Sequence, residues 1–250
     1  MKVVTWNVNS LTARYARVTE WITANAPDVV LLQETKMTDA KFPTAGFAEL
    51  GYESAHYGQG QWNGVAVLSR VGLEDVSRGF GDEDSEARLI GATCGGVRVY
   101  SCYVPNGRAL DNDHYAYKLR WLAALAALLA ERTQPTIAGG DFNVTPTDLD
   151  CYDPAAFVGA THVSAPERAA LAAIEATGLV DITRRLHPEE TIYSWWDYRN
   201  GAFHRGWGLR IDLLYLDESL AARASASYVD RNARKGEKPS DHAPVVVEID

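Results

Sequence analysis

The chain has 250 residues, of which 46% are hydrophobic and 23% are charged, values typical of a globular protein that buries a substantial core. Its formal net charge of −9 argues against attraction of nucleic acid by the molecule as a whole, because contact with phosphates depends mainly on Lys and Arg. No apolar run approaches the roughly 20 residues of a membrane-spanning helix, and the three cysteines show neither a disulfide pattern nor metal-ligand spacing.

The N-terminal segment passes directly into a strand-like pattern and lacks the layout of a signal peptide, so we expect a cytoplasmic protein. The sequence contains no Pro-, Gly- or Ser-rich linker and no short repeat. We therefore expect a single domain over residues 1–250, and nothing in the sequence demands more than a monomer.

Short runs rich in Val, Ile, Leu and Tyr recur along the chain and predict strands. In chain order they are Lys2–Trp6, Val29–Gln33, Gly64–Ser69, Leu89–Cys94, Val97–Val104, Thr136–Gly140, Arg210–Leu216 and Pro244–Ile249. The runs at 29–34 and 136–143 each deliver an acidic residue at their end, a slight indication of two similar halves.

Three segments predict helices, namely Thr12–Ala26, Asp111–Arg132 and Glu167–Thr177. The first ends before Pro27, the second repeats Leu at helical spacing, and the third lies between Pro166 and Gly178, which favour a helix start and a helix end. Since strands outnumber helices and helices separate groups of strands, we expect an α/β fold of packed layers in which helices cover sheets.

Basic residues cluster beside several candidate site residues although the total charge is acidic. The clusters are residues 231–238, the pair Arg14 and Arg17, and the group Arg199, Arg205 and Arg210. A solvated face is the ordinary interpretation of one such run. Several runs beside candidate catalytic residues favour a local site for an anionic ligand.

Polar side chains end the first two predicted strands. Asn7 follows the first strand, and Glu34 follows the second. Taken alone, such a Glu is more often a helix cap or a surface residue. As a metal ligand it needs other oxygen atoms nearby, because magnesium prefers near-octahedral coordination by oxygen.

Two later segments place an Asp beside a hydrogen-bonding partner at the edge of an apolar run. Asp141 lies two residues before Asn143, so in an extended stretch both side chains point the same way. Asp241 directly precedes His242. Carboxylates, a His and amides are suited to binding a hard metal ion and to handling a phosphate ester.

Two further positions have both a structural and a functional interpretation. Tyr103, Asn106 and Arg108 lie in a segment with turn residues, which is either a simple turn or a place where a phosphate rests against a phenol and a guanidinium. Asp212 lies in an apolar run, where a buried carboxylate needs a partner. That partner is either a His that Asp212 orients or an Arg in a structural ion pair.

An aromatic patch of Trp195, Trp196 and Trp207 lies among arginines. It is either core packing or a surface that stacks on bases or holds an exposed sugar. The remaining histidines stand alone without metal-binding spacing, and we interpret them as ordinary residues: His56, His114, His162, His187 and His204.

Together these segments resemble the exonuclease III family of apurinic/apyrimidinic endonucleases, within the endonuclease/exonuclease/phosphatase superfamily. The resemblance covers nearly the whole chain. Its motifs, in the family's order, are Trp6-Asn7-Val8-Asn9, Leu32-Gln33-Glu34-Thr35-Lys36, Tyr103-Val104-Pro105-Asn106-Gly107, Gly140-Asp141-Phe142-Asn143, Leu209-Arg210-Ile211-Asp212 and Ser240-Asp241-His242. Residues 143–149, Trp195 and residues 209–214 are closer to the DNA-repair branch.

The resemblance implies a four-layered α/β sandwich, in which two packed, mainly antiparallel sheets are flanked by helices and the active site lies where strand ends converge. It implies hydrolysis of the phosphodiester 5′ to abasic sites in duplex DNA, with 3′-to-5′ exonuclease and 3′-end-processing activity. The implied partner is duplex DNA with abasic sites or 3′ ends, without membrane association. The implied cofactor is Mg²⁺, with Mn²⁺ as the alternative.

Matched residue by residue, the resemblance implies that Glu34 binds the metal ion, with Asn7 and Asp241 close to it. It implies that Asp141 orients or deprotonates the attacking water with the help of Asn143.

The resemblance also implies that His242, polarised by Asp212, holds a non-bridging phosphate oxygen, and that Tyr103 contacts the phosphate or the leaving oxygen. Trp195, Leu209 and Ile211 are implied to wall the pocket of the flipped-out abasic sugar. The other implied substrate contacts are Arg88, Asn106 and Arg108.

The chain departs from the family at position 9, where Asn9 replaces a metal-binding Asp of some relatives, so we do not assign Asn9 as a ligand. The acidic net charge predicts weak non-specific DNA binding that depends strongly on salt. Residues 150–165 match a DNA-facing loop of relatives least well, which leaves the preferred strand and end of the DNA open.

Two other functions are open alternatives. A hydrolase of the same superfamily could act on a phospholipid head group, an inositol phosphate or RNA, although the aromatic pocket with flanking arginines favours DNA. A catalytically silent DNA-binding member is expected to have lost at least one catalytic residue, whereas this chain retains Glu34, Asp141, Asn143, Asp212, Asp241 and His242.

Overall fold

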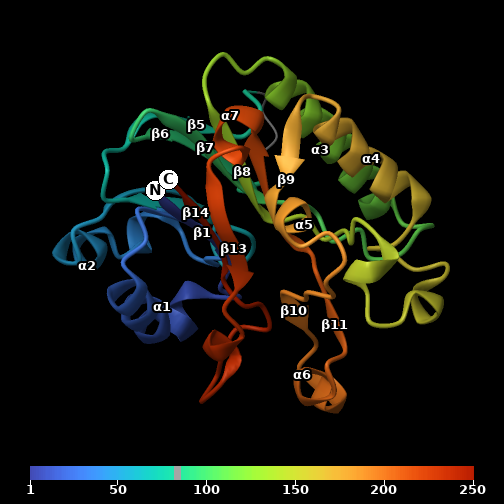
Figure 1. Cartoon of the computed structure of the whole chain (residues 1–250). Helices are drawn as coiled ribbons and strands as arrows, with labels where there is room; N and C mark the ends of the chain where they lie inside the picture. The colour runs from blue at the N-terminus through green and yellow to red at the C-terminus, as the bar shows by residue number, and fades with distance from the viewer. Residues whose placement is uncertain (82–85) are drawn as a thin grey trace.

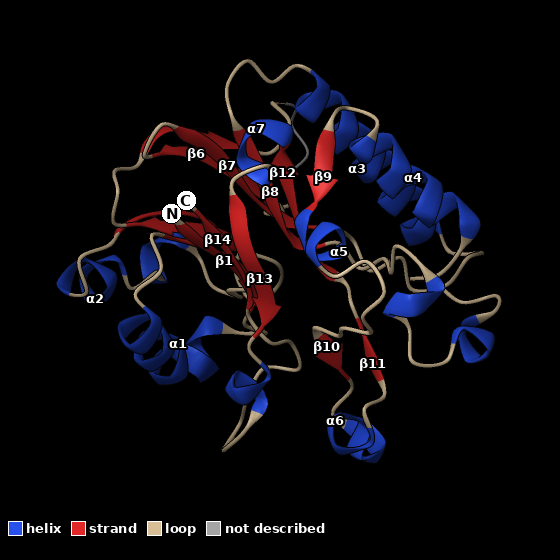
Figure 2. Cartoon of the chain, viewed as in Figure 1, coloured by secondary structure: helices blue, strands red, loops and turns tan. Residues whose placement is uncertain are grey.

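Two six-stranded sheets face each other in the computed structural model, which describes residues 1–81 and 86–250 (Figures 1 and 2). The first sheet has the order β13-β14-β1-β2-β4-β3, and the second has the order β5-β6-β7-β8-β12-β9. Each contains one parallel pair, β1 with β2 and β7 with β8, and its other pairs are antiparallel. The expected sandwich of mainly antiparallel sheets is therefore confirmed.

The strands of the first sheet are β1 (Lys2–Asn7), β2 (Val29–Gln33), β3 (Glu53–Tyr57), β4 (Val65–Ser69), β13 (Ala224–Val229) and β14 (Val245–Ile249). Those of the second sheet are β5 (Glu74–Arg78), β6 (Leu89–Cys94), β7 (Val97–Tyr103), β8 (Thr136–Asp141), β9 (Leu179–Asp181) and β12 (Asp212–Asp217). A separate short hairpin consists of β10 (Trp195–Trp196) and β11 (Gly208–Leu209).

The α-helices are α1 (Leu11–Asn25), α2 (Thr44–Glu49), α3 (Asp113–Ala130), α4 (Ala165–Glu175), α5 (Ile182–Leu186), α6 (Ala202–Arg205) and α7 (Glu218–Ala221). Short 3₁₀ helices are η1 (Asp39–Lys41), η2 (Asp148–Asp150), η3 (Pro154–Phe157), η4 (Arg199–Gly201) and η5 (Arg231–Arg234). In the described parts of the chain, helices long and apolar enough to cross a membrane are absent.

Three apolar layers hold the sandwich together. The inner faces of the two sheets meet through buried residues such as Leu31, Ile137 and Leu214. On the outer side of the first sheet, α1 contributes Val18 and Ile22 to a second cluster (Figure 1). The outer side of the second sheet is covered by α3 and α4 through residues that include Trp121, Leu125 and Ile174. Inner strands such as β1, β2 and β8 are buried on both faces, and apolar residues predominate on both.

The predicted elements are present, with ends that differ by a few residues. The third predicted helix begins at Ala165 rather than Glu167, because Ser164 accepts a hydrogen bond from the Glu167 backbone and the Glu167 side chain reaches back to Ser164. This capping box starts the helix ahead of the predicted residue. The strand predicted from Arg210 begins at Asp212, because Arg210 is turned into a buried ion-pair network.

The slight similarity between 29–34 and 136–143 has a topological counterpart. Strands β2 and β8 each follow a helix and pair in parallel with the strand that precedes that helix, β1 or β7. The acidic residue of each segment therefore lies at the carboxyl end of the second strand of a β–α–β unit.

Candidate active site

The ends of strands from both sheets converge on one cavity. In parallel strands the carboxyl ends lie together, which brings Asn7 of β1 beside the end of β2, and Tyr103 opposite Asp141. In the antiparallel pair of β8 and β12, Asp212 at the start of one strand lies opposite Asp141 at the end of the other.

The cavity has a volume of about 180 Å³. Its lining residues are Glu34, Tyr103, Asn106, Asp141, Asn143, His162, Trp195, Leu209, Ile211, Asp241 and His242. Apart from His162, these are all residues that the sequence predicts for the site, drawn from segments up to 208 positions apart. Asn7 and Asp212 lie directly behind the lining and contact it through hydrogen bonds.

Asp141 is the most deeply buried carboxylate in contact with the cavity, with 2% of the residue exposed. Asn7 Nδ2 donates a 2.9 Å hydrogen bond to its Oδ2, and the Asn143 backbone N–H donates a 2.9 Å bond to its Oδ1. Burial raises the pKa of Asp141 to about 7, although the nearby His242 imidazolium opposes that rise. A carboxylate whose pKa lies near neutral pH is suited to accepting a proton.

His242 lies between two carboxylates. Its Nδ1 is 2.8 Å from Asp212 Oδ2, and its Nε2 is 3.7 Å from Asp141 Oδ2. Ser194 Oγ donates a 2.6 Å hydrogen bond to the same Asp212 oxygen. Burial disfavours the charged imidazole, but the carboxylates of Asp212 and Asp141 outweigh it and raise the pKa of His242 to about 10. The partner of Asp212 is therefore a His, as one of the two interpretations predicted.

The protonation of His242 can be measured directly. In metal-free protein we expect its imidazole to stay protonated at neutral pH, and we expect Asp212→Asn to lower its pKa. Because the pKa of His242 is raised, the attraction between its imidazolium and the two carboxylates contributes its full stabilisation of the fold below pH 6.5. That contribution is lost as the pH rises through about 10. An NMR titration of the histidine ring nitrogens in chelator provides the test, and an ordinary titration near pH 6.5 contradicts it.

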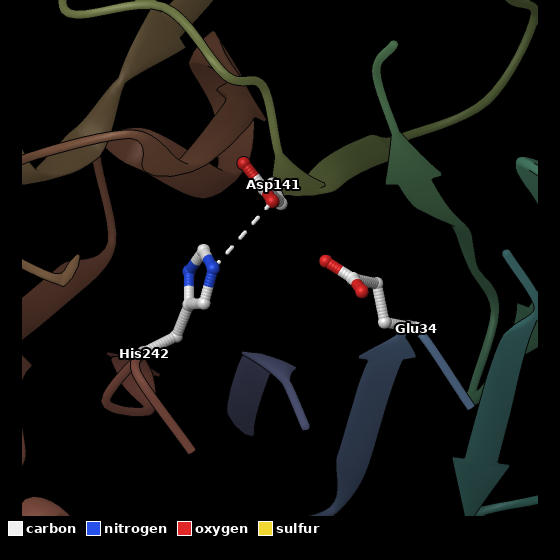
Figure 3. A group of neighbouring side chains, drawn as sticks. All are labelled: Glu34, Asp141 and His242. Carbon is white, nitrogen blue, oxygen red and sulfur yellow. Dashed lines mark ion pairs between the residues drawn. The ribbon is translucent and has the colours of Figure 1, made fainter. Parts of the chain in front are cut away.

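Glu34, Asp141 and His242 each direct one polar atom into a common space, and these atoms lie within 4.8 Å of one another (Figure 3). The two carboxylates suit a hard divalent cation. The imidazole fits this role poorly, because a protonated ring offers only N–H donors. The donor set therefore fits a metal ion held by Glu34, with Asp141 beside it and His242 facing an anion.

Asn7 and Asp241 are engaged in other hydrogen bonds in this structure. Asn7 Nδ2 bridges Glu34 Oε1 at 2.8 Å and Asp141 Oδ2, which aligns the two carboxylates. Asp241 accepts hydrogen bonds from Asn9 Nδ2 at 3.0 Å and from Trp195 Nε1 at 3.1 Å. Their assignment to the metal stays a prediction.

An apolar wall closes one side of the cavity. Trp195 of β10 pairs with Leu209 of β11, and Ile211 follows two residues later on the same side. Arg210, between them, points the other way and is 1% exposed, with Asp150 at 2.6 Å and Asp181 at 2.8 Å. The buried ion pairs on one side of the segment thus fix the two apolar side chains on the other.

The interpretation of the basic clusters as an anion site is wrong for Arg210 and Arg234, which are buried, and Arg17 makes hydrogen bonds within the protein. Arg210 is buried in the ion-pair network just described. Arg17 donates to the backbone carbonyls of Ala233 and Lys235, and Arg234 donates to Ser240 O at 2.7 Å. Arg17 and Arg234 hold residues 233–240, the segment before His242, in place through these hydrogen bonds.

Arg88 and Arg108, both predicted to contact DNA, occupy different environments. Arg88 is 5% exposed, pairs with Glu86, and stacks over the Tyr103 ring with 4.8 Å between its guanidinium carbon and the ring centre. It therefore supports Tyr103 from behind. Arg108 is exposed, and its φ of 60° places it in a tight turn beside Asn106.

His162 is a residue of the cavity that the sequence analysis treated as ordinary. Its Nδ1 lies 2.5 Å from the Asn143 carbonyl oxygen, and its backbone N–H donates to Glu167 Oε1 at 3.0 Å. Burial lowers its pKa to about 4, so the ring is neutral. No spacing in the sequence marks this His, because long-range contacts bring it to the site.

Lys118 and Glu167 form an ion pair with both side chains fully buried, directly behind the cavity. Lys118 Nζ also donates to the carbonyl oxygens of Asn143 at 2.7 Å and Asn106 at 3.2 Å. Glu167 accepts from Thr161 Oγ1 at 2.6 Å. The pair therefore ties two helices to two segments that line the cavity.

Lys118→Met is expected to lower the free energy of unfolding by about 3–5 kcal/mol, because it leaves the Glu167 carboxylate buried without its cation. Urea denaturation measures this loss. The matched control is Lys2→Met, which removes a partly exposed pair with Glu248 and should cost about 0–1 kcal/mol. Equal losses in the two variants contradict the expectation.

Comparisons with known proteins agree with this geometry. The family model described as Endonuclease/Exonuclease/phosphatase family matches residues 4–242. The chain is 33% identical to an exodeoxyribonuclease III of Haemophilus influenzae, with 100% of each protein covered. It is 41% identical, with a TM-score of 0.98, to a 3′ phosphatase from Neisseria bound to a product DNA hairpin, covering 100% of this chain and 99% of that one. It is 39% identical, with a TM-score of 0.97, to an AP endonuclease from Archaeoglobus fulgidus, covering 100% of this chain and 99% of that one.

Proposed function

This chain belongs to the endonuclease/exonuclease/phosphatase family, and from that premise we propose that it is a divalent-metal-dependent DNA repair nuclease. It hydrolyses the phosphodiester 5′ to abasic sites in duplex DNA, and it has 3′-to-5′ exodeoxyribonuclease and 3′-end-processing activity. The observation that carries the proposal is the convergence of Glu34, Asp141 and His242 beside an apolar wall in one cavity. The named relatives, which are nucleases and a DNA 3′ phosphatase, support it.

Asp141 is the group that accepts the proton of the attacking water. Its pKa of about 7 leaves a useful fraction ionised at neutral pH while keeping it basic enough to take a proton. The Asn143 N–H and Asn7 Nδ2 fix both of its oxygens, so the lone pairs that remain point into the cavity. The water is thereby held in one orientation toward the phosphorus.

His242 holds a non-bridging phosphate oxygen through its Nε2–H. Asp212 keeps the ring protonated and fixes its direction, so the donor is in place before charge develops. Burial raises the pKa of Tyr103 well above its usual value, so its hydroxyl stays protonated and donates to the phosphate or the leaving oxygen. Mg²⁺, or Mn²⁺ in its place, held by Glu34 would neutralise charge on the phosphate.

The size of the cavity supports an abasic sugar as the group that it accepts. A volume of about 180 Å³ lies below the roughly 300 Å³ at which pockets for drug-sized ligands begin. Trp195, Leu209 and Ile211 offer an apolar surface to one face of the sugar. On this proposal the apolar wall excludes a nucleotide that keeps its base, which gives the selection.

We further propose that the chain acts as a monomer of one domain in the cytoplasm. The partner is duplex DNA, and its binding is salt-dependent, because Lys and Arg contacts to phosphates release counterions. The exposed Arg108 is a DNA contact on the rim, whereas Arg88 acts through Tyr103.

Three duplexes test the proposal and separate its parts. One carries a tetrahydrofuran abasic analogue, one has a recessed 3′-hydroxyl end, and one ends in a 3′ phosphate. Metal-dependent incision of the first establishes the abasic endonuclease, whereas products from the other two alone assign the protein to 3′-end processing. If all three stay intact while an inositol phosphate or a phospholipid head group is hydrolysed, the DNA substrate is wrong.

A further inference from the structure

The turn that carries Glu34 is held by backbone hydrogen bonds, and the buried hydroxyl of Thr35 lies within it, outside the cavity. Thr35 lies between Glu34 and Lys36, and both of these neighbours have a φ of 52°. Such left-handed conformations are unfavourable for residues other than Gly and persist only where surrounding contacts impose them. Thr35 is completely buried, so its side chain is one of those contacts.

Thr35, His56 and Asp39 form a chain of polar contacts, which we call the threonine relay. Thr35 Oγ1 lies 2.8 Å from His56 Nε2, and His56 Nδ1 lies 2.8 Å from Asp39 Oδ1. We assign the ring proton to Nδ1, which faces the Asp39 carboxylate, so that Nε2 accepts a hydrogen bond from the Thr35 hydroxyl. The ring stacks on Phe42 with 4.3 Å between centres, which fixes its plane.

The backbone around the relay is built to leave room for it. A Cβ at Gly64 would lie 2.1 Å from Thr35 Oγ1, and a Cβ at Gly58 would lie 2.3 Å from His56 Cε1. The Thr35 N–H donates to Gly64 O at 3.1 Å. Both glycines therefore allow the close approach that the relay requires.

An Asp–His–Thr series can also serve as a nucleophilic triad, but this one is not placed where it could attack a substrate. Thr35 is 0% exposed, so its hydroxyl has no access to a substrate. Burial lowers the pKa of His56 to about 4, so the ring is neutral and its charge does not act on the cavity. The relay lies instead beside the left-handed backbone on both sides of Thr35.

We propose that the threonine relay positions Glu34 for metal binding, so that Thr35 and His56 set the affinity of the site for the divalent ion. The inference rests on the proposed function, in which Glu34 is a metal ligand. Lys36 strengthens the connection, because its Nζ lies 2.7 Å from Glu34 Oε2 and its own left-handed backbone depends on the same turn. Loss of the Thr35 hydroxyl frees the turn to relax and moves the carboxylate.

The test is the dissociation constant of Mn²⁺ for the full chain, measured by electron paramagnetic resonance without substrate. Thr35→Val keeps the volume and removes the hydroxyl, and it should weaken Mn²⁺ binding about tenfold, which corresponds to about 1.4 kcal/mol. Thr35→Ser keeps the hydroxyl and should bind Mn²⁺ nearly as the parent does. Unchanged affinity in Thr35→Val overturns the inference.

A matched control separates positioning from general loss of stability. Thr183 is 1% exposed, and its hydroxyl lies 2.9 Å from Ser227 Oγ, between α5 and β13. Thr183→Val should lower thermal stability about as much as Thr35→Val while leaving the Mn²⁺ affinity unchanged. If both variants weaken Mn²⁺ binding equally, the effect is not positional and the inference fails.

Two more variants keep the test decisive. Asp39 is half-exposed, so Asp39→Asn should fold even if Thr35→Val does not. A loss of Mn²⁺ affinity in Asp39→Asn, smaller than the roughly tenfold loss expected for Thr35→Val, supports the relay. If Asp39→Asn is the only variant that folds and its Mn²⁺ affinity is unchanged, the inference is overturned. Glu34→Gln separates the two proposals. If Glu34→Gln binds Mn²⁺ as tightly as the parent, the proposed metal site and this inference both fail. If it binds weakly and Thr35→Val binds normally, only this inference fails.

Discussion

Replacing Asp141 with Asn is expected to lower the single-turnover rate of DNA cleavage on the order of 10³-fold, because it removes the group that takes the proton from water. The amide also presents an N–H₂ group where two donors, Asn7 Nδ2 and the Asn143 N–H, now point at carboxylate oxygens. The effect should fall on the rate constant and not on DNA affinity, since Asp141 is 2% exposed.

The matched control is Asp148→Asn. The Asp148 carboxylate is largely exposed, pairs with Arg168, and lies seven residues further along the chain. This control should leave the cleavage rate within about twofold of the parent, since surface ion pairs contribute little. A parent-like rate in Asp141→Asn contradicts the assigned role of Asp141. A comparable loss in Asp148→Asn shows instead that the effect does not come from the catalytic carboxylate.

The second large effect is expected at the pair of His242 and Asp212. His242→Asn should lower the rate constant about 10²- to 10³-fold, because it removes a preorganised donor from the phosphate oxygen on which charge develops. Asp212→Asn should lower it less, since the imidazole remains but loses the carboxylate that keeps it protonated and oriented.

The double variant tests whether the two residues act as one unit. Because the hydrogen bond of Asp212 to His242 is its direct contact with the catalytic groups, removing both should cost about as much as removing His242 alone. Steady-state kinetics on an abasic duplex, with thermal melting to verify folding, measures the three variants. If the losses in activation free energy of the two single variants simply add in the double variant, the mechanism is contradicted, because Asp212 then acts on the reaction independently of His242.

The sequence predicts most of the site because its residues stand at strand ends. Glu34 and Asp141 each terminate an apolar run, and parallel pairing inside each sheet places such ends on one edge. The partnership of Asp212 with His242 was one of two open interpretations, and the 2.8 Å contact confirms it. What the sequence supplies here is local periodicity together with the chemistry of each side chain.

The features that the sequence does not reveal depend on contacts between distant segments. Strands β10 and β11 have two residues each, too few for a periodic pattern, although they form the pocket wall. His162 reaches the cavity through Glu167 and the Asn143 carbonyl. Arg210 looks like part of a basic surface until its buried partners are known, because charge in a sequence does not indicate direction.

The edge strand β5 is an element of the fold that the sequence pattern does not reveal. Its residues Glu74–Arg78 are exposed and largely polar, so no hydrophobic alternation marks them as a strand. The threonine relay is equally hidden, since His56 and Asp39 gain meaning only when the chain brings them to Thr35. Long-range packing decides these features, and it leaves no short-range pattern in the sequence.

The measurement that tests the account most directly is single-turnover cleavage of an end-labelled duplex that carries one tetrahydrofuran abasic analogue. Parent protein is assayed with Mg²⁺ and with chelator, beside Asp141→Asn with Mg²⁺. We expect incision 5′ to the analogue with Mg²⁺, leaving a 3′-hydroxyl that a polymerase extends, with no incision in chelator and a rate on the order of 10³-fold lower for Asp141→Asn. Incision that persists in chelator, or that proceeds at the parent rate in Asp141→Asn, contradicts a metal-dependent reaction at this site.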